Sequence, residues 1–261
     1  MPVNTKMRSE ASKLVPYGLL ATKAWLMKQG LERHAIDNLV KSRQLKTAAR
    51  GVLVRPDTPL KWQGVVCSLQ RMGSDVTVGG LSALQLHGFA HYLPLSERTP
   101  VHLYGRAPLP PWVNRLGLST PFVWHKSSRL FTAAPAETPD HGFTQSLPWG
   151  DQPWTLRVAT PERAILEVLD DVPSKISFEH ADQLMQGLTT LSPRRLEDLL
   201  RLARNVKVKR LFFWLAERQG YAWFKKLVPS EFDLGSGKRV LAKGGKYVPK
   251  YRITVPEEMH G

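Results

Sequence analysis

The sequence predicts an α+β protein that begins with a winged helix-turn-helix and continues into a larger mixed domain. Two short amphipathic helical patterns separated by Gly30 precede a basic hairpin pattern. Among closely spaced Pro and Gly, the short apolar segments VHLY, FVWH, FTQSL and WTLRVA predict strands, and helical periodicity resumes after residue 160. We therefore expect a winged helix-turn-helix DNA-binding domain in residues 1–60 and a mixed α+β effector domain in residues 61–261.

Residues 19–56 contain the helix-turn-helix pattern itself. The first helix is predicted to begin at Thr22, whose hydroxyl can cap it, and to end at Gly30, which permits a left-handed turn. The second helix runs from Glu32 to about Arg43, although a small capping residue is more common than Glu before a recognition helix. Its buried stripe consists of Ala35, Ile36, Leu39 and Val40.

After Gln44 the pattern changes from helical to alternating, which predicts a hairpin, or wing, that turns at Gly51. A helix over residues 5–15 would complete a three-helix base. Arg and Asn side chains can read base edges, and Lys and Arg can hold phosphates. The polar face of this region offers such groups, and the predicted DNA contacts are Lys23, Arg33, His34, Asn38, Lys41, Arg43, Lys46 and Arg50. The alternative is a basic face that only contacts solvent, but helix, turn, helix and wing occurring together favour DNA.

The net charge of +15 and a pI near 10.1 favour an anionic partner. Positive charge is concentrated in residues 1–60 and again in residues 192–252, whereas the stretch between them is nearly neutral. The second group predicts an antitoxin or nucleic-acid surface, for flanking DNA or for RNA, unless it is merely a solvated face. Its candidate residues are Arg194, Arg195, Arg201, Arg204, Lys207, Lys209, Arg210, Lys238 and Arg239.

The second half of the chain has clear helix starts. Thr160-Pro161 and Ser192-Pro193 combine a capping residue with proline in the first turn, and Ser177 begins another helix. A fourth helix covers KVKRLFFWLAERQG. The segment FDLGSGKRVL is predicted to form a hairpin that turns at Gly235–Gly237, before the alternating KYVPKYRITV.

Several motifs suggest chemistry but lack essential residues. The run Gly235–Arg239 resembles a phosphate loop without its first glycine or its magnesium-binding hydroxyl, so a glycine turn explains it better. His87 and His91 have the spacing of a zinc pair, but Gly88 interrupts the helix between them. Ser82 lacks the second glycine of a catalytic elbow, and we expect it to cap a helix.

The acidic residues do not indicate a nuclease. No Glu-x-Lys or Asp-x-Lys occurs in the sequence, and Glu167, Asp170 and Asp171 are expected to form a solvated helix end before Pro173. Cys67 lies among apolar residues, which predicts a buried thiol. We therefore expect no catalysis, no metal and no cofactor. The chain shows no signal peptide and no apolar run long enough to cross a bilayer, which predicts a cytoplasmic protein without membrane contact.

Taken together, several segments resemble the AbiEi family of antitoxins from type IV toxin–antitoxin systems. They are GGLSALQLHG, VHLYGRAPLPPW, LRVATPERAILEVLDDVP and VKVKRLFFWLAERQGYAWF followed by LGSGKR. The resemblance implies a phage-defence protein that represses its own operon by binding inverted repeats in the promoter. It also implies a C-terminal domain that counters a nucleotidyltransferase-like toxin without a stable complex. We expect a monomer in solution with two copies on the operator. The alternative is an RNA-binding or toxin-modulating protein whose winged helix mainly makes protein contacts.

Overall fold

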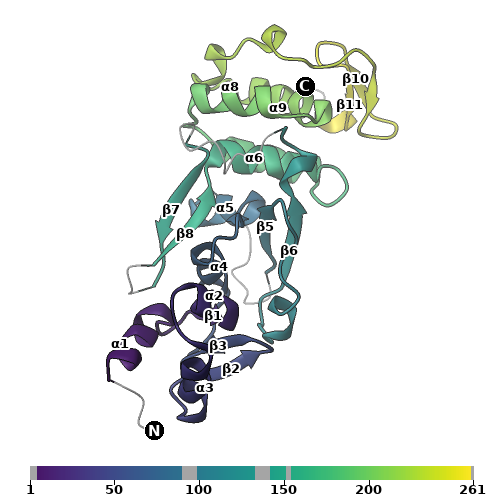
Figure 1. The fold of residues 1–261 in the computed structure, drawn as a ribbon. Helices are drawn as coiled ribbons and strands as arrows, with labels where there is room; N and C mark the ends of the chain where they lie inside the picture. Colours follow the sequence, from purple (N-terminus) through teal and green to yellow (C-terminus); the bar gives the residue numbers. More distant parts are fainter. Residues whose placement is uncertain (1–4, 90–98, 133–141, 151–153, 260–261) are drawn as a thin grey trace.

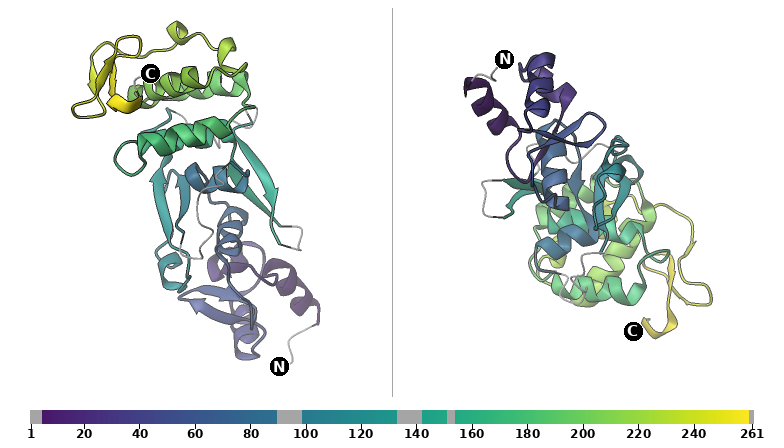
Figure 2. Two further views of the ribbon diagram at one scale, coloured as in Figure 1. Left: turned by 180° about the vertical axis from the view of Figure 1, so that it is seen from behind. Right: turned by 90° about the horizontal axis from the view of Figure 1, so that it is seen from below.

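The protein is elongated, with the winged helix at one end and the C-terminal segment at the other (Figure 1). A computed structural model describes residues 5–89, 99–132, 142–150 and 154–259. A five-stranded sheet lies in the middle, and the view from behind shows the same order of layers (Figure 2). The chain therefore runs from one end of the molecule to the other, as an α+β protein with a smaller N-terminal part.

The N-terminal part is a three-helix unit with a small antiparallel sheet. Its elements are α1 (Thr5–Leu14), β1 (Leu20–Thr22), α2 (Lys23–Lys28), α3 (Arg33–Lys41), β2 (Lys46–Ala49) and β3 (Val52–Val54). The strand order is β1-β3-β2, so the predicted β2–β3 hairpin is confirmed. The sequence pattern missed β1, because three residues carry too little periodicity to reveal a strand.

Local signals set the ends of these helices as predicted. The Thr22 Oγ1 accepts a hydrogen bond of 3.1 Å from the Trp25 backbone N–H and caps α2. Gly30 has a φ of +95°, which a residue with a side chain rarely adopts, and it lets the chain turn into α3. A separate apolar core holds the three helices together, formed by Ala11, Val15, Ala21, Leu26, Leu31, Ile36, Leu39, Leu45 and Leu53.

The central sheet has the strand order β6-β5-β4-β8-β7. Its strands are β4 (Thr77–Val78), β5 (Val101–Gly105), β6 (Phe122–Lys126), β7 (Thr144–Pro148) and β8 (Thr155–Ala159). Short 3-10 turns η1 (Val113–Arg115) and η2 (Ser127–Arg129) flank β6. The four longer strands lie where the apolar segments predicted them. The central strand β4 has only two residues, which is too short for an alternating pattern, so the sequence did not reveal it.

Helix α4 (Trp62–Arg71) connects the winged helix to this sheet. The Leu20 backbone N–H donates to the Ser68 hydroxyl at 2.9 Å, and Gly64 allows α4 to approach the Gly18 carbonyl, where a β-carbon would clash. Residues of β1 and β3 therefore share one apolar core with α4 and the sheet. The domain boundary near residue 60 stays a prediction, and the packing of α4 makes the two parts structurally continuous.

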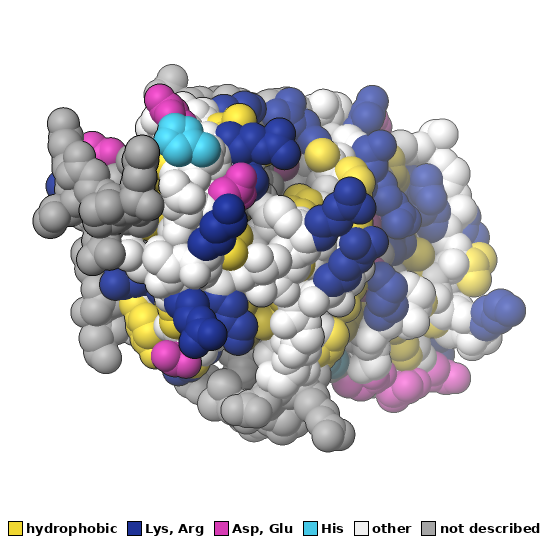
Figure 3. All heavy atoms as spheres, turned by 60° about the horizontal axis from the view of Figure 1, so that its bottom comes forward, with side chains coloured by type: hydrophobic (Ala, Val, Ile, Leu, Met, Phe, Trp, Pro, Cys, Tyr) yellow, Lys and Arg dark blue, Asp and Glu magenta, His cyan; other side chains and the backbone are white. Residues whose placement is uncertain are grey.

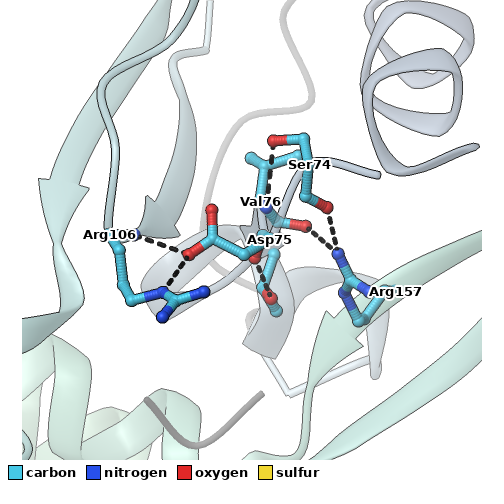
Figure 4. Close-up of polar contacts among 6 residues, drawn as sticks. Ser74, Asp75, Val76, Arg106 and Arg157 are labelled. Atoms are coloured by element: carbon cyan, nitrogen blue, oxygen red, sulfur yellow. Dashed lines mark hydrogen bonds and ion pairs between the residues drawn. The ribbon is translucent and has the colours of Figure 1, made fainter. Parts of the chain in front are cut away.

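Polar contacts secure the turn between α4 and β4 (Figure 4). The Asp75 carboxylate accepts hydrogen bonds from the backbone N–H and the Nε of Arg106, at 2.8 and 3.3 Å. On the other side, the Arg157 guanidinium donates to the carbonyls of Ser74 and Val76, at 2.6 and 3.2 Å. These contacts join β4 to residues at or next to β5 and β8, and so compensate for the short length of β4.

The rest of the protein is mainly helical. Helix α5 (Gly80–Leu86) packs against α6 (Pro161–Asp170), which separates the sheet from α7 (Phe178–Gly187), α8 (Pro193–Leu202) and α9 (Val206–Gln219) (Figure 1). The predicted helix starts are confirmed, with Ser177 and Ser192 as side-chain caps. Thr160 occupies the capping position of α6, but its buried hydroxyl makes no cap bond, so the predicted role of that hydroxyl is wrong. Among the described residues, no helix is both long and apolar enough to span a bilayer.

One acidic residue expected at a solvated helix end lies in the core instead. Glu167 and Arg163 are each 1% exposed, and their Oε1 and Nε atoms lie 2.7 Å apart. The second carboxylate oxygen accepts a 2.9 Å hydrogen bond from the Gly80 backbone N–H, and a β-carbon on Gly79 would clash with Glu167. The GGLSALQLHG and TPERAILE segments are therefore complementary, because Gly79 of the first makes room for the buried ion pair of the second. Burial raises the pKa of the Glu167 carboxyl, and Arg163 partly offsets this effect.

The predicted hairpin around Gly235–Gly237 is wrong. The C-terminal sheet contains β9 (Arg239–Val240), β10 (Lys246–Val248) and β11 (Ile253–Val255), and the hairpin is formed by β10 and β11. Strand β9 pairs in parallel with β11. The glycine segment therefore precedes a strand whose partner lies further along the chain, and it does not form the turn of a hairpin. The 3-10 turns η5 (Phe224–Lys226), η6 (Pro229–Glu231) and η7 (Glu257–Met259) complete this region.

Candidate nucleic-acid interface

Helix α3 presents a polar face to solvent at the end of the molecule. Ala35, Ile36 and Leu39 are buried, whereas Arg33, His34 and Lys41 are exposed and Asn38 is half-buried. This division follows from the 3.6-residue period of the helix, which separates the apolar stripe from the polar residues. Glu32 precedes the helix and makes no side-chain cap bond, in agreement with its unusual residue type.

Ion pairs modify two of the predicted contacts. The Lys23 Nζ lies 2.5 Å from the Asp37 carboxylate, and its side chain is only 28% exposed. The hydrogen bond from Lys23 is the main reason that the pKa of Asp37 is lowered. The His34 Nδ1 lies 3.0 Å from the Glu32 carboxylate, but both side chains are largely exposed. The Lys23 side chain therefore links α2 to α3, and its contact with DNA stays a prediction, whereas His34 is largely exposed.

The wing is held to the start of α2 through the backbone. The Lys23 N–H donates to the Gly51 carbonyl at 2.8 Å, and Gly51 has a φ of +75° at the hairpin turn. Lys46 on β2 and Arg50 at the turn are both exposed. Arg43, just after α3, is exposed in a left-handed conformation with a φ of +57°. These cations extend the basic surface from the helix to the hairpin.

A space-filling view from the winged-helix end shows Lys and Arg side chains spread over this face, with fewer acidic side chains among them (Figure 3). We call the outward side of α3 together with the wing the recognition face. It consists of Arg33, His34, Asn38, Lys41, Arg43, Lys46 and Arg50. Such a face can hold phosphates with its flexible cations and offer Arg and Asn to base edges.

The second basic group is not one surface, and its prediction needs correction. Lys209 and Arg210 are 5% and 1% exposed, so neither can belong to an accessible surface. The Arg210 guanidinium donates to three backbone carbonyls, those of Leu234, Gly237 and Arg252, at 2.5, 2.6 and 3.1 Å. It therefore fastens the C-terminal segment to α9.

Other members of the group are also engaged in the fold. The Lys207 Nζ donates to the carbonyls of Asp170 and Val172 at 2.6 and 2.7 Å, at the C-terminal end of α6. Arg195 lies 3.6 Å from Glu162, and Arg201 lies 2.8 Å from Glu197. The exposed members outside these ion pairs are Arg194, Arg204, Lys238 and Arg239. Only these four keep the basic character that the sequence suggested.

The residues that suggested a zinc pair, a catalytic serine or a reactive cysteine have structural surroundings. The His87 Nε2 lies 2.8 Å from the Ala159 carbonyl oxygen, whereas His91 falls outside the described residues. The Ser82 hydroxyl accepts from the His102 backbone N–H at 2.9 Å, so it joins α5 to β5 and does not cap a helix. Cys67 is 2% exposed, and burial raises the pKa of its thiol, as expected for an unreactive cysteine.

Sequence reasoning missed one cluster with ligand chemistry. His102, His125 and Asp171 come together from β5, β6 and the end of α6, although 69 residues separate the first from the last. Burial lowers the pKa of both imidazoles, that of His125 to about 4. The spacing of these residues in the sequence matches no metal motif, so only the fold reveals that they are neighbours.

The recognition face and the helix-turn-helix with its wing define a winged-helix protein joined to a mixed α+β domain. The chain belongs to the AbiEi antitoxin family, the transcriptional regulators of type IV toxin–antitoxin systems. Residues 4–95 match the family model of the AbiEi antitoxin N-terminal domain, and residues 98–256 match the model of the AbiEi antitoxin of type IV systems. The family resemblance predicted from the sequence is therefore confirmed, and this family is described as a regulator and antitoxin.

A solved structure has the same overall fold. The RV2827C protein from Mycobacterium tuberculosis superposes with a TM-score of 0.57 at 15% sequence identity, over 95% of this chain and 89% of that one. At this identity the likeness concerns the fold alone. No curated protein matches the sequence.

Proposed function

We propose that this protein represses its own operon by binding an inverted repeat in the promoter. The observation that supports this most directly is the recognition face, where Arg33 and Asn38 lie on the outward side of α3 beside an exposed basic wing. Family membership as a transcriptional regulator agrees with it. In this proposal α3 enters the major groove, where Arg can pair with guanine and Asn with adenine.

The wing supplies the sequence-independent part of the affinity. Lys46 and Arg50 would contact phosphates on the flank of the groove, and Lys41 and Arg43 would do so at the other end of α3. An inverted repeat presents two equivalent half-sites, so two copies of a monomeric protein would bind related by a twofold axis. The basic excess of the whole chain would draw it to DNA, with an affinity that falls as salt rises.

A gel shift with the full-length protein tests the first part. The upstream region of the operon should bind more tightly than a duplex of the same length and composition whose sequence has been shuffled. Two stepwise shifted bands should appear when both half-sites are intact, and one band when one half-site is shuffled. Equal affinity for the intact and shuffled duplexes would contradict operator recognition and would favour the alternative of an RNA-binding or toxin-modulating role.

We propose further that the C-terminal domain counters a nucleotidyltransferase-like toxin without forming a stable complex and without catalysis of its own. The support is family membership in a type IV system together with the exposed cations Arg194, Arg204, Lys238 and Arg239. The other five members of the predicted group are buried, ion-paired or hydrogen-bonded to backbone carbonyls, so within that group an anionic target would be recognised by these four. The proposed place of action is the cytoplasm.

A growth rescue tests the antitoxin part separately from repression. The toxin is expressed from an unrelated promoter, so that repression cannot protect the cells. Wild-type protein should restore growth, and the charge-reversed R194E/R204E variant should protect poorly if an anionic target is bound there, while keeping its operator affinity. The K225E/K226E variant serves as a matched charge control, because these two exposed lysines lie in η5 and outside the proposed group. Full rescue by R194E/R204E would exclude these arginines from the antitoxin surface.

A further inference from the structure

Two histidines lie side by side because of the register of two parallel strands. Strand β5 pairs with β6 so that Tyr104 is opposite His125, and His102 lies two residues before Tyr104 on the same face. The Tyr104 and His125 rings stack with centroids 4.4 Å apart and an angle of 8° between their planes. The His102 Nδ1 and His125 Nε2 atoms are joined by a hydrogen bond of 3.0 Å, so one ring nitrogen of each imidazole lies at the point where the two rings meet.

A carboxylate reaches the same point from α6. Asp171 caps the C-terminal end of this helix, and its side chain is only 14% exposed. One ligand atom from each of His102, His125 and Asp171 can be chosen so that all three lie within 4.8 Å of one another. Within the part of the chain that the structure describes, this is the only cluster of three or more such side chains. The packing of α6 against the sheet therefore assembles two imidazoles and a carboxylate.

We propose that His102, His125 and Asp171 bind a divalent transition metal ion, with Zn²⁺ as the best match. Two ligands bound tetrahedrally at about 2.0–2.1 Å are roughly 3.3 Å apart, which is close to the separation of the two imidazole nitrogens. Imidazole and carboxylate ligands together are typical of Zn²⁺ and other divalent first-row transition metal ions, whereas Mg²⁺ and Ca²⁺ favour oxygen ligands alone. The three ligand atoms now lie within 4.8 Å of one another, so metal binding would have to draw the Asp171 carboxylate closer to the imidazoles.

The surroundings leave room for the remaining coordination position. A pocket of about 230 Å³ opens beside the cluster and is lined by His125 and Asp171 together with Asp170 and Lys175. Several water molecules can occupy such a volume, since one takes about 30 Å³ in the liquid. The Lys175 Nζ lies 2.9 Å from one Asp171 carboxylate oxygen and is 59% exposed, so it can orient the carboxylate or move away when a cation binds. Three protein ligands with an open fourth position are typical of zinc sites that keep a water.

Zinc and cobalt binding by the full-length protein without an affinity tag tests the proposal. After removal of metal with a chelator, Zn²⁺ should bind in a ratio of one per chain in competition with a chromophoric chelator. Co²⁺ should give visible absorption of the intensity expected for four-coordinate binding. Zinc should also raise the melting temperature of the protein. This site does not depend on the proposed DNA binding, so its test is independent of the gel shift.

Three variants locate the binding. H125Q and D171N should each lower the zinc affinity at least 10-fold and abolish the visible cobalt absorption and the thermal shift. H180A on α7 should leave all three readouts unchanged, because His180 lies outside the cluster. Circular dichroism of the metal-free variants tests whether they fold. D171N is the more conservative substitution, so it carries the test if H125Q does not fold. Uptake below a tenth of an equivalent by the wild type, or equal uptake by D171N and H180A, would overturn the proposal.

Discussion

The two basic regions of this protein carry similar charge in the sequence but use it differently in the structure. On the recognition face, Arg33, Lys46 and Arg50 extend into solvent from a helix and a hairpin whose apolar sides are buried. In the C-terminal region, Arg210 and Lys207 direct their charges at backbone carbonyls and so hold segments together. The charge density of a segment therefore does not reveal whether its cations bind a partner or stabilise the fold.

The physical difference lies in what covers the side chains. In the winged helix, the apolar side of α3 is buried in the small core of the three helices, so the opposite side of α3 remains exposed. Helix α9 is covered on several sides, since every residue from Val208 to Ala216 is buried. A cation on such a helix must find acceptors inside the protein, because a buried charge without partners is costly. Substitutions in the two regions should therefore affect different measurements.

The largest expected effect follows from breaking the buried ion pair on α6, which packs beneath the C-terminal helices. Replacing Glu167 with Ala would leave the Arg163 charge and the Gly80 N–H without their partner, at a cost of about 3–5 kcal/mol in the free energy of unfolding. Urea denaturation measures this change. E258A, at an exposed position in η7, is the control and should change stability by less than about 0.5 kcal/mol. Similar stability of the two variants would show that the pair is not a structural element.

The next largest effect on stability is expected for Arg210, a buried cation, in comparison with Arg204, an exposed cation nearby in the chain. R210A should lower the free energy of unfolding by about 2–3 kcal/mol, because three carbonyls lose their donor and part of this loss is regained by hydration. R204A, at an exposed position just before α9, should lower it by less than about 0.5 kcal/mol. Operator affinity of the folded R210A protein should match that of the wild type. A large loss of operator affinity with unchanged stability would show that Arg210 binds nucleic acid and does not stabilise the fold.

On the recognition face the effect should appear in binding and not in stability. R33A and N38A should each cost about 1–3 kcal/mol of affinity for the operator and much less for a shuffled duplex, because base contacts are lost. Quantitative gel shifts at fixed salt measure both affinities. K225A, far from the winged helix at η5, is the control. Equal losses on both duplexes would identify the two residues as phosphate contacts.

The smallest change is expected in the salt dependence of binding by the wing. The K46A/R50A double variant should weaken binding to operator and shuffled duplex by a similar factor and preserve the ratio of the two affinities. Each lost phosphate contact should reduce the slope of log affinity against log salt by about 0.9. The slope is measured over a series of salt concentrations. An unchanged salt slope in the double variant would show that Lys46 and Arg50 do not contact DNA phosphates.

Local chemistry in the sequence predicted much of the fold. The cap at Thr22, the left-handed turn at Gly30 and the serine caps of α7 and α8 all lie where their residue types indicated. The outward side of α3 also follows from helical periodicity, so the residues of the recognition face were available from the sequence. These features depend on neighbours within a few positions, which is why a single sequence can reveal them.

Only the tertiary structure decided the features that depend on distant segments. The short β4 forms because strands and arginines on both sides complete it, and β9 pairs with β11 although the glycines before it suggested a local hairpin. Gly79, just before α5, leaves space for the buried Glu167, and His102, His125 and Asp171 meet through strand register and helix packing. By itself, the sequence determined the winged helix and the family of the chain. The burial of its charges depended on contacts between segments far apart in the chain, which carry no local signal.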